Sequence, residues 1–130
     1  MEFFIAKKLK SGSFEDLDRM IREELKNEGF GVITEIDLKK TFREKIDVDF
    51  RNYKILGACN PTFAHKALLA EDKIGTFLPC NVVIQESPHG GLEVMVFDPA
   101  SAMMELDNPE LSKLSIEIRE RLIKVLDKLN

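Results

Sequence analysis

The strongest constraint on the fold is a short connection between two apolar segments late in the chain. Residues 80–84 and 92–97 are rich in strand-forming side chains, and a Ser-Pro-His-Gly-Gly run at 87–91 lies between them. Apolar runs separated by so short a turn-forming segment predict a β-hairpin. Since two strands joined in this way run antiparallel, the sequence predicts that the sheet is at least partly antiparallel.

The first half of the chain permits a second interpretation. Apolar patterning predicts strands at 3–9, 30–36 and 53–58. Ser13 begins an amphipathic helix that ends near Gly29, and Asp37 can cap a short basic helix. Alternating strands and helices also suit a parallel α/β sheet, so only the hairpin favours an antiparallel arrangement here.

Two further helices follow from capping signals. Asn60 is a good N-cap, and the helix it begins is expected to end near residues 71–72. Asn108 begins a long helix whose apolar stripe continues to Leu129. A stripe of this width is typical of a helix lying on a sheet, although part of it can also face a partner subunit. The segment 98–108 is the least regular, and its two methionines are expected to fill apolar gaps.

Length and composition place the chain among ordinary globular proteins. Its 130 residues are 44% hydrophobic and 32% charged, which predicts a single domain spanning residues 1–130. The net charge is −4 and the basic residues are interspersed with acidic ones, so nucleic acid is not expected as a partner. The sequence contains neither a membrane-length apolar run nor a signal-peptide pattern, which predicts a cytoplasmic protein without membrane association.

The stretch from Gly57 to His65 is the most informative for chemistry. It places Cys59 at a strand end directly before a helix, where the amides of the first turn favour a thiolate. His65 lies one turn further, and its side chain can lean back toward the start of the helix. Cys59, Asn60, Pro61 and His65 are therefore candidate site residues.

A second corner repeats part of this pattern. Pro79, Cys80 and Asn81 enter a strand, and if the two cysteine-bearing strands are neighbours the corners meet at one end of the sheet. Three interpretations stay open: two inert buried thiols, a ligand or metal pocket with Cys59, His65 and Cys80 as candidate metal ligands, or thiol redox chemistry. The reducing cytoplasm argues against a structural disulfide. Asp98, after the last strand, is a further ligand-binding candidate, although an aspartate there more often caps a turn.

Several of these segments together resemble one known family. They are Gly57-Ala58-Cys59-Asn60-Pro61 with Ala64-His65, then Leu78-Pro79-Cys80-Asn81-Val82-Val83, and finally Asp98-Pro99. In this combination, nearly the whole chain resembles the family called domain of unknown function 302. The resemblance implies an α+β fold in which helices pack on a curved antiparallel sheet, with a topology similar to the TATA-box-binding-protein-like class and often a dimer. It supplies no catalytic residues.

Three functions from different classes follow as expectations. The first is a small domain that binds a small ligand or a metal near the two Cys-Asn corners, with the cofactor unspecified. The second is a homodimeric interaction module in which the cysteines only contribute to packing. The third is a thiol enzyme with Cys59 as nucleophile, His65 as base and Asn60 as a polar orienting group. No complete catalytic motif distinguishes among them.

Overall fold

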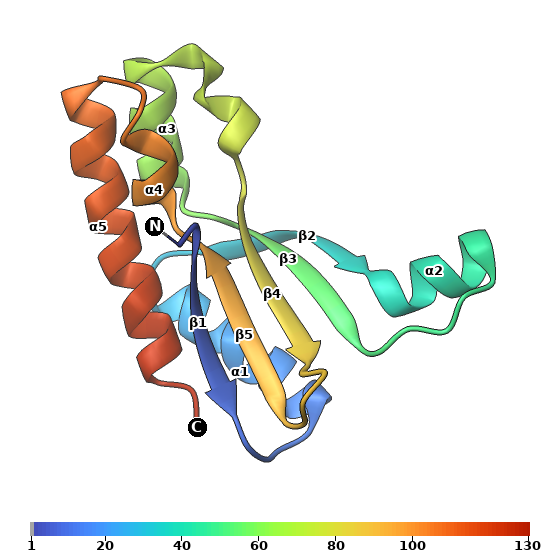
Figure 1. The fold of residues 1–130 in the computed structure, drawn as a ribbon. Helices are drawn as coiled ribbons and strands as arrows, with labels where there is room; N and C mark the ends of the chain where they lie inside the picture. The colour runs from blue at the N-terminus through green and yellow to red at the C-terminus, as the bar shows by residue number, and fades with distance from the viewer. Residues whose placement is uncertain (1) are drawn as a thin grey trace.

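The computed structural model describes residues 2–130, in which five strands form one antiparallel sheet (Figure 1). The strands are β1 (Phe4–Leu9), β2 (Gly31–Asp37), β3 (Tyr53–Cys59), β4 (Cys80–Glu86) and β5 (Leu92–Phe97). Their order across the sheet is β1-β5-β4-β3-β2, and every neighbouring pair is antiparallel. The predicted α+β class, a twisted antiparallel sheet packed by helices, is confirmed, and the parallel alternative is wrong. The more specific likeness to the TATA-box-binding-protein-like topology stays a prediction.

Side-chain caps begin the helices where the sequence predicts them. The helical elements are α1 (Phe14–Asn27), α2 (Leu38–Ile46), α3 (Pro61–Ala70), the 3-10 helix η1 (Asp72–Phe77), α4 (Pro99–Met103) and α5 (Pro109–Asp127). Ser13, Asp37, Asn60 and Asn108 each accept a hydrogen bond from a first-turn amide. The short helices η1 and α4 were not predicted, because elements of five or six residues carry too little periodicity.

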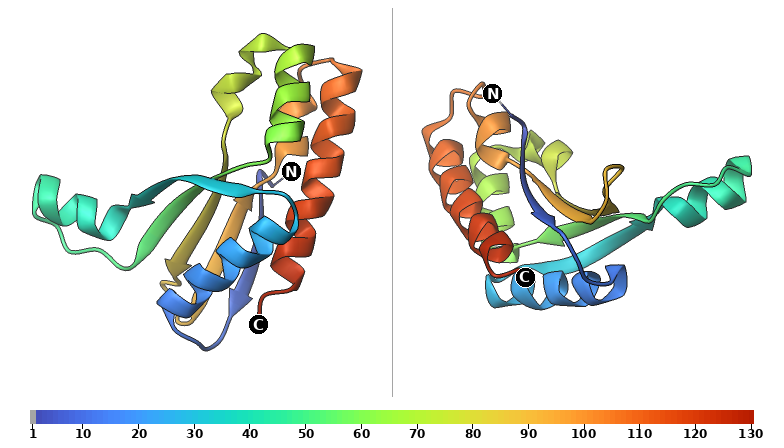
Figure 2. Two further views of the ribbon diagram at one scale, coloured as in Figure 1. Left: turned by 180° about the vertical axis from the view of Figure 1, so that it is seen from behind. Right: turned by 60° about the horizontal axis from the view of Figure 1, so that its bottom comes forward.

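Helices α1 and α5 cover one face of the sheet and form the main core with it. Figure 2 shows them lying together across this face. Their buried side chains meet those of the three central strands; the most deeply buried members include Leu17, Ile21, Leu25, Leu56, Val82, Ile84, Val94, Leu122 and Val125. None of the helices within residues 2–130 combines the length and apolarity needed to cross a membrane.

The opposite face of the sheet carries no helix over its centre (Figure 1). Alternate residues of the strands point to this face, because successive side chains of a strand lie on opposite sides. They include Phe4, Tyr53, Val83, Met95 and Phe97, all half-buried. This part of the uncovered face is therefore apolar, whereas Gln85 and Glu93 make it polar further along β4 and β5.

The segment β2-α2-β3 forms an arm that projects away from the body (Figures 1 and 2). Helix α2 has no buried residue. Ile33 and Ile46 are 62% and 63% exposed on this arm. The tip of the arm therefore gains little from packing within its own chain.

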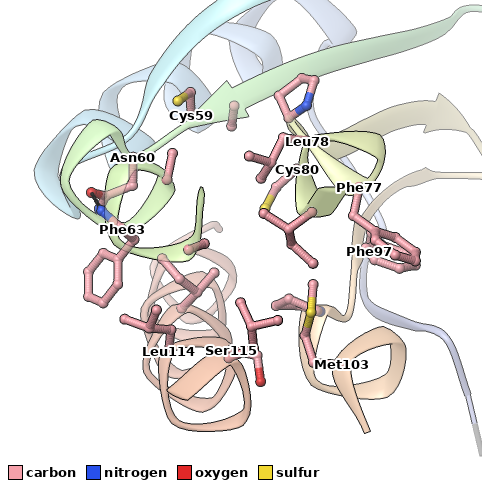
Figure 3. A pocket seen from close by; sticks show the side chains of 18 of the residues that line it. Cys59, Asn60, Phe63, Phe77, Leu78, Cys80, Phe97, Met103, Leu114 and Ser115 are labelled. Atoms are coloured by element: carbon pink, nitrogen blue, oxygen red, sulfur yellow. Dashed lines mark hydrogen bonds between the residues drawn. The ribbon is translucent and has the colours of Figure 1, made fainter. Parts of the chain in front are cut away.

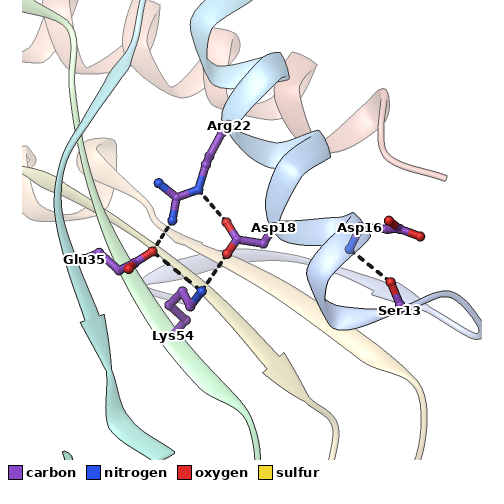
Figure 4. Close-up of polar contacts among 6 residues, drawn as sticks. All are labelled: Ser13, Asp16, Asp18, Arg22, Glu35 and Lys54. Atoms are coloured by element: carbon purple, nitrogen blue, oxygen red, sulfur yellow. Dashed lines mark hydrogen bonds and ion pairs between the residues drawn. The ribbon is translucent and has the colours of Figure 1, made fainter. Parts of the chain in front are cut away.

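A cluster of four charged side chains fastens α1 to the base of this arm (Figure 4). Asp18 of α1 accepts hydrogen bonds at 2.6 Å from both Arg22 Nε and Lys54 Nζ. Glu35 of β2 pairs with both cations. Burial alone would raise the pKa of Asp18, but the hydrogen bonds from Arg22 and Lys54 outweigh it and hold that pKa below its ordinary value.

Candidate functional site

The two cysteine-bearing corners lie at the same end of the sheet. Cys59 ends β3 and Cys80 begins β4, and the register of these neighbouring strands pairs Ala58 with Cys80. Gly57 permits a close crossing here, because a Cβ atom at that position would lie 2.8 Å from the ring of Pro79. The sheet thereby brings both corners beside the start of α3.

An apolar, partly open cavity of about 70 Å³ lies at this end, bordered by the sheet, α3, η1, α4 and α5 (Figure 3). Its lining is almost entirely hydrocarbon and includes Phe30, Phe63, Ala64, Ala67, Ile74, Phe77, Leu78, Pro79, Phe97, Met103, Leu111, Leu114 and Ile118. A cavity holds a water molecule from roughly 10–15 Å³, but water also needs polar partners. This cavity is therefore large enough for a small molecule and too apolar to favour water.

The few polar groups in the lining already have partners. Asn60 Oδ1 accepts from the Phe63 amide, and its Nδ2 donates to the Glu28 carbonyl, both at 3.4 Å. Ser115 Oγ donates to the Ser112 carbonyl at 2.8 Å. Because these groups are committed to the protein's own backbone, the cavity offers little to a polar ligand.

The two cysteines differ in orientation and environment. Figure 3 shows the sulfur of Cys80 directed into the cavity and that of Cys59, at its margin, turned away from the centre. Burial, with a smaller contribution from the nearby Cys59, raises the pKa of Cys80 to about 11. Cys80 is therefore a neutral thiol near pH 7 and contributes a soft apolar surface to the cavity.

The other predicted site residues are distributed over several places. Pro79 lines the cavity, whereas Asn81 is exposed and lies in the hollows outside it. Pro61 occupies the first turn of α3, and both Pro61 and His65 are exposed and outside the cavity lining. The structure therefore does not bring His65 into a shared pocket with the cysteines.

Asp98 lies outside the cavity as well. It is buried, caps α4 through the Ala100 amide at 3.0 Å, and pairs with Arg119 Nε of α5 at 3.1 Å. It lines a separate depression beside β1 together with Ser101. The capping role that the sequence favours for this aspartate is what the structure shows.

The candidate metal ligands do not form a metal site. Within residues 2–130, no group of three or more histidine, cysteine, aspartate or glutamate side chains is arranged to hold a metal ion. Cys59, His65 and Cys80 thus fail to converge, because His65 projects from the exposed side of α3. The geometry favours the ligand form of the first expectation over its metal form.

Sequence reasoning missed most of the cavity wall. Phe77, Phe97 and Leu111 come from three separate elements, and no local pattern links them. The gap-filling role expected of the methionines holds for Met103, which is buried in the lining.

The structure thus defines a class of small α+β protein with an open antiparallel sheet and an apolar cavity at one end. The chain belongs to the family described as Domain of unknown function DUF302, whose sequence profile matches residues 5–129. The fold is similar to the crystal structure of an uncharacterized conserved DUF302 protein from Bacillus stearothermophilus, with a TM-score of 0.91, 26% sequence identity and complete coverage of both chains. A search of curated proteins found no match.

Proposed function

We propose that this protein binds a small apolar molecule, or the apolar end of a larger one, in the cavity beside Cys80. The observation that carries the proposal is the combination of an internal space with a hydrocarbon lining whose polar groups are already satisfied. Burial of apolar ligand surface is the driving force that such a lining provides. At about 70 Å³ the cavity suits a ligand part of only a few heavy atoms.

Benzene and xenon are suitable probes, because both enter dry apolar cavities in proteins. Methyl NMR spectra recorded during a titration should show saturable shifts for Ile74 and Ile118, which line the cavity. Methyl groups of Val94 and Leu122, in the main core, should shift far less. The absence of saturable shifts at the cavity methyls would contradict the proposal.

A cavity-filling substitution gives a matched test on α3. Ala67→Leu adds carbon atoms to the lining and should abolish the benzene-induced shifts. Leu69→Ala on the same helix changes a side chain that is 76% exposed, and benzene binding should be retained. Equal benzene affinity in both variants would place the binding elsewhere.

A specific observation also favours a second function, and we infer that the arm pairs with a second copy of the chain. Strand β2 is an edge strand with β3 as its neighbour, so its outer backbone groups can pair with another strand. Ile33 and Ile46 expose apolar surface along the same arm. A two-fold axis can bring two such edges together in antiparallel pairing.

The long C-terminal helix is a weaker candidate for this contact. Its stripe residues Leu111, Ile118, Leu122 and Leu129 are buried within their own chain. The interaction module is therefore proposed through the arm, with the cysteines contributing to packing.

Sedimentation equilibrium tests the contact between copies. The protein should be dimeric at high micromolar concentration, and Ile33→Glu with Ile46→Glu should shift it to a monomer. Leu69→Glu, on the exposed side of α3, serves as the control and should leave the dimer intact. A monomeric wild-type protein at that concentration would contradict the inference.

The thiol-enzyme expectation stays a prediction that labelling can test. Because burial raises the pKa of Cys80 from 9.0 to about 11, its thiolate fraction at pH 7.5 should be about a hundredfold lower than that of an unperturbed thiol. Iodoacetamide should therefore modify Cys59 well before Cys80 in the folded protein. Mass spectrometry of the two peptides measures both rates, and equally slow labelling of both would remove the case for a reactive Cys59.

The cytoplasmic location likewise stays a prediction.

A further inference from the structure

Two hollows lie outside the cavity, and each shares lining side chains with its neighbour. Phe77, Pro79 and Phe97 border both the cavity and an outer hollow of about 280 Å³. Asn81 and Phe97 in turn border both that hollow and a groove of about 330 Å³ on the uncovered face. The cavity, this hollow and the groove therefore adjoin one another in a row that leads around the end of the sheet onto its open face.

Two aromatic side chains lie at the border between the cavity and the outer hollow. Figure 3 shows Phe77 and Phe97 together on one side of the cavity. Phe77 belongs to the short helix η1 and is 40% exposed, and Phe97 is the last residue of β5. A ligand that extends out of the cavity would pass these two rings, and its apolar surface would stay in contact with apolar side chains.

The groove continues the apolar character along the sheet. Its floor includes the half-buried side chains of Val83 and Met95, which are paired across β4 and β5. Phe4 and Tyr53 border it. Asn81, at the bend, contributes the one amide side chain of the groove lining.

A cation lies beyond the far end of this groove. The guanidinium of Arg51 lies 5.8 Å from the ring centre of Tyr53, and its Nε donates to Gln85 Oε1 at 3.0 Å. Its hydrogen-bond partner is thus a neutral amide, and within residues 2–130 no carboxylate forms a salt bridge with it. Gln85 also donates to Glu93, and the register places Lys8 opposite Glu93. The charged side chains near this end thus include Arg51, Lys8 and Glu93, and also Glu86, whose carboxylate accepts from the Asn52 amide at 2.7 Å.

We propose that the ligand is a linear alkyl carboxylate whose methyl end occupies the cavity, whose chain follows the groove, and whose carboxylate lies near Arg51. An unbranched chain can follow a narrow bent path that a rigid ring system cannot. Guanidinium groups recognise carboxylates through paired hydrogen bonds. The proposal rests on the proposed function, since the chain end needs the interior cavity.

A chain-length series tests the path. Hexanoate, octanoate and decanoate, each kept below its aggregation concentration, are titrated into the full chain by calorimetry. The association constant should rise about fourfold for each added methylene that is buried. Decanoate that binds no more tightly than hexanoate would overturn the proposal. Continued binding of benzene in that case would leave the proposed cavity function standing.

Groove variants locate the chain. Val83→Lys places a charge on the groove floor and should weaken decanoate binding at least tenfold while benzene still binds in the cavity. Met95→Gln is a second groove variant that removes apolar surface with little change in size, and it should weaken decanoate binding in the same direction. Unchanged decanoate affinity in both folded variants would overturn the proposal.

The carboxylate position has its own control. Arg51→Gln should reduce the preference for decanoate over decanol about tenfold, whereas Arg43→Gln, on α2, should leave that preference unchanged. If the wild-type protein, Arg51→Gln and Arg43→Gln all prefer decanoate over decanol to the same extent, Arg51 does not contact the carboxylate. If the ligand-free protein is a dimer and Val83→Lys dissociates it, the groove is the contact with a second copy of the chain. That result would overturn the proposal.

Discussion

The two ends of the covered sheet face are built from similar residues but packed to different densities. Toward one end, α1 and α5 bring Ile21, Leu25 and Leu122 into one core with Ile84, and all four side chains are fully buried. At the other end, α3 presents Ala64 and Ala67, and apart from α5 the other helices around the cavity are only five or six residues long. Short elements and small side chains fill space less completely than long amphipathic helices.

The difference in packing indicates that stability and binding are located at different ends of this small fold. The tightly packed end supplies the stability that holds the strands in register. The looser end retains a cavity whose lining costs some of that stability, because side chains around it lack contacts on one side. Binding of an apolar molecule would restore those contacts.

The largest expected effect comes from truncating α5 at its two ends. Leu122→Ala removes a fully buried side chain from the packed end and should lower the free energy of unfolding by about 2–5 kcal/mol. Leu114→Ala, on the same helix, removes a half-buried side chain that already borders the cavity, and should cost about 1 kcal/mol. Urea denaturation measures both. Equal losses would contradict the contrast in packing.

Enlarging side chains should again cost more at the packed end than at the cavity end. Val94→Leu forces extra volume into the packed core and should destabilise the protein by about 1–3 kcal/mol. Ala67→Leu adds volume where the cavity can receive it, so its cost should stay below about 1 kcal/mol. Thermal unfolding compares them, and a larger loss for Ala67→Leu would show that the cavity end cannot adapt.

The charged cluster at the base of the arm sharpens the comparison through pH. Because Asp18 has a pKa below 3.8 in the folded protein, its stabilising contribution is present above that pH and is lost as the pH falls through the folded value. Asp18→Asn should therefore cost about 1–2 kcal/mol at pH 7. The difference between the two proteins should shrink below pH 3.8, as measured by urea unfolding across a pH series. A difference that is constant with pH would exclude the ionised carboxylate as its source.

The sequence predicted the elements of the fold better than their assembly. Capping residues such as Ser13 and Asn108 act locally, so they mark helix starts without knowledge of the rest of the chain. The hairpin of β4 and β5 is also local, and its turn determines its direction. By contrast, the pairing of β1 with β5 joins residues about ninety positions apart, and no short pattern records it.

The candidate site shows the same division. The sequence neighbours of Cys80, Asn60 and Pro79 mark the ends of elements and so predict a shared corner, and all three residues line the cavity. His65 lies one helical turn after Asn60, which predicts that it is near the same corner, but the rotation of α3 exposes it. The spacing of apolar residues in a helix indicates which side of it is buried. In α3 the buried side carries Phe63 and the alanines, and His65 lies outside it.

The smallest expected effect concerns the helix that closes the cavity end. Asp98 holds α4 against α5 through Arg119, whose side chain is 42% exposed, so solvent screens the pair. Arg119→Gln should therefore change the global free energy of unfolding by only about 0.5 kcal/mol. Amide hydrogen exchange at the end of α4, where Met104 donates to the Ala100 carbonyl, should nevertheless accelerate severalfold, because α4 has only five residues and the pair of Asp98 with Arg119 ties its start to α5. Arg43→Gln, in the exposed pair with Asp47 on the arm, is the matched control and should leave exchange in α4 unchanged. If exchange in α4 is the same in Arg119→Gln as in wild type, packing of Met103 against Ile74 and Leu111 is sufficient to hold the helix, and the looser end is more rigid than its short elements suggest.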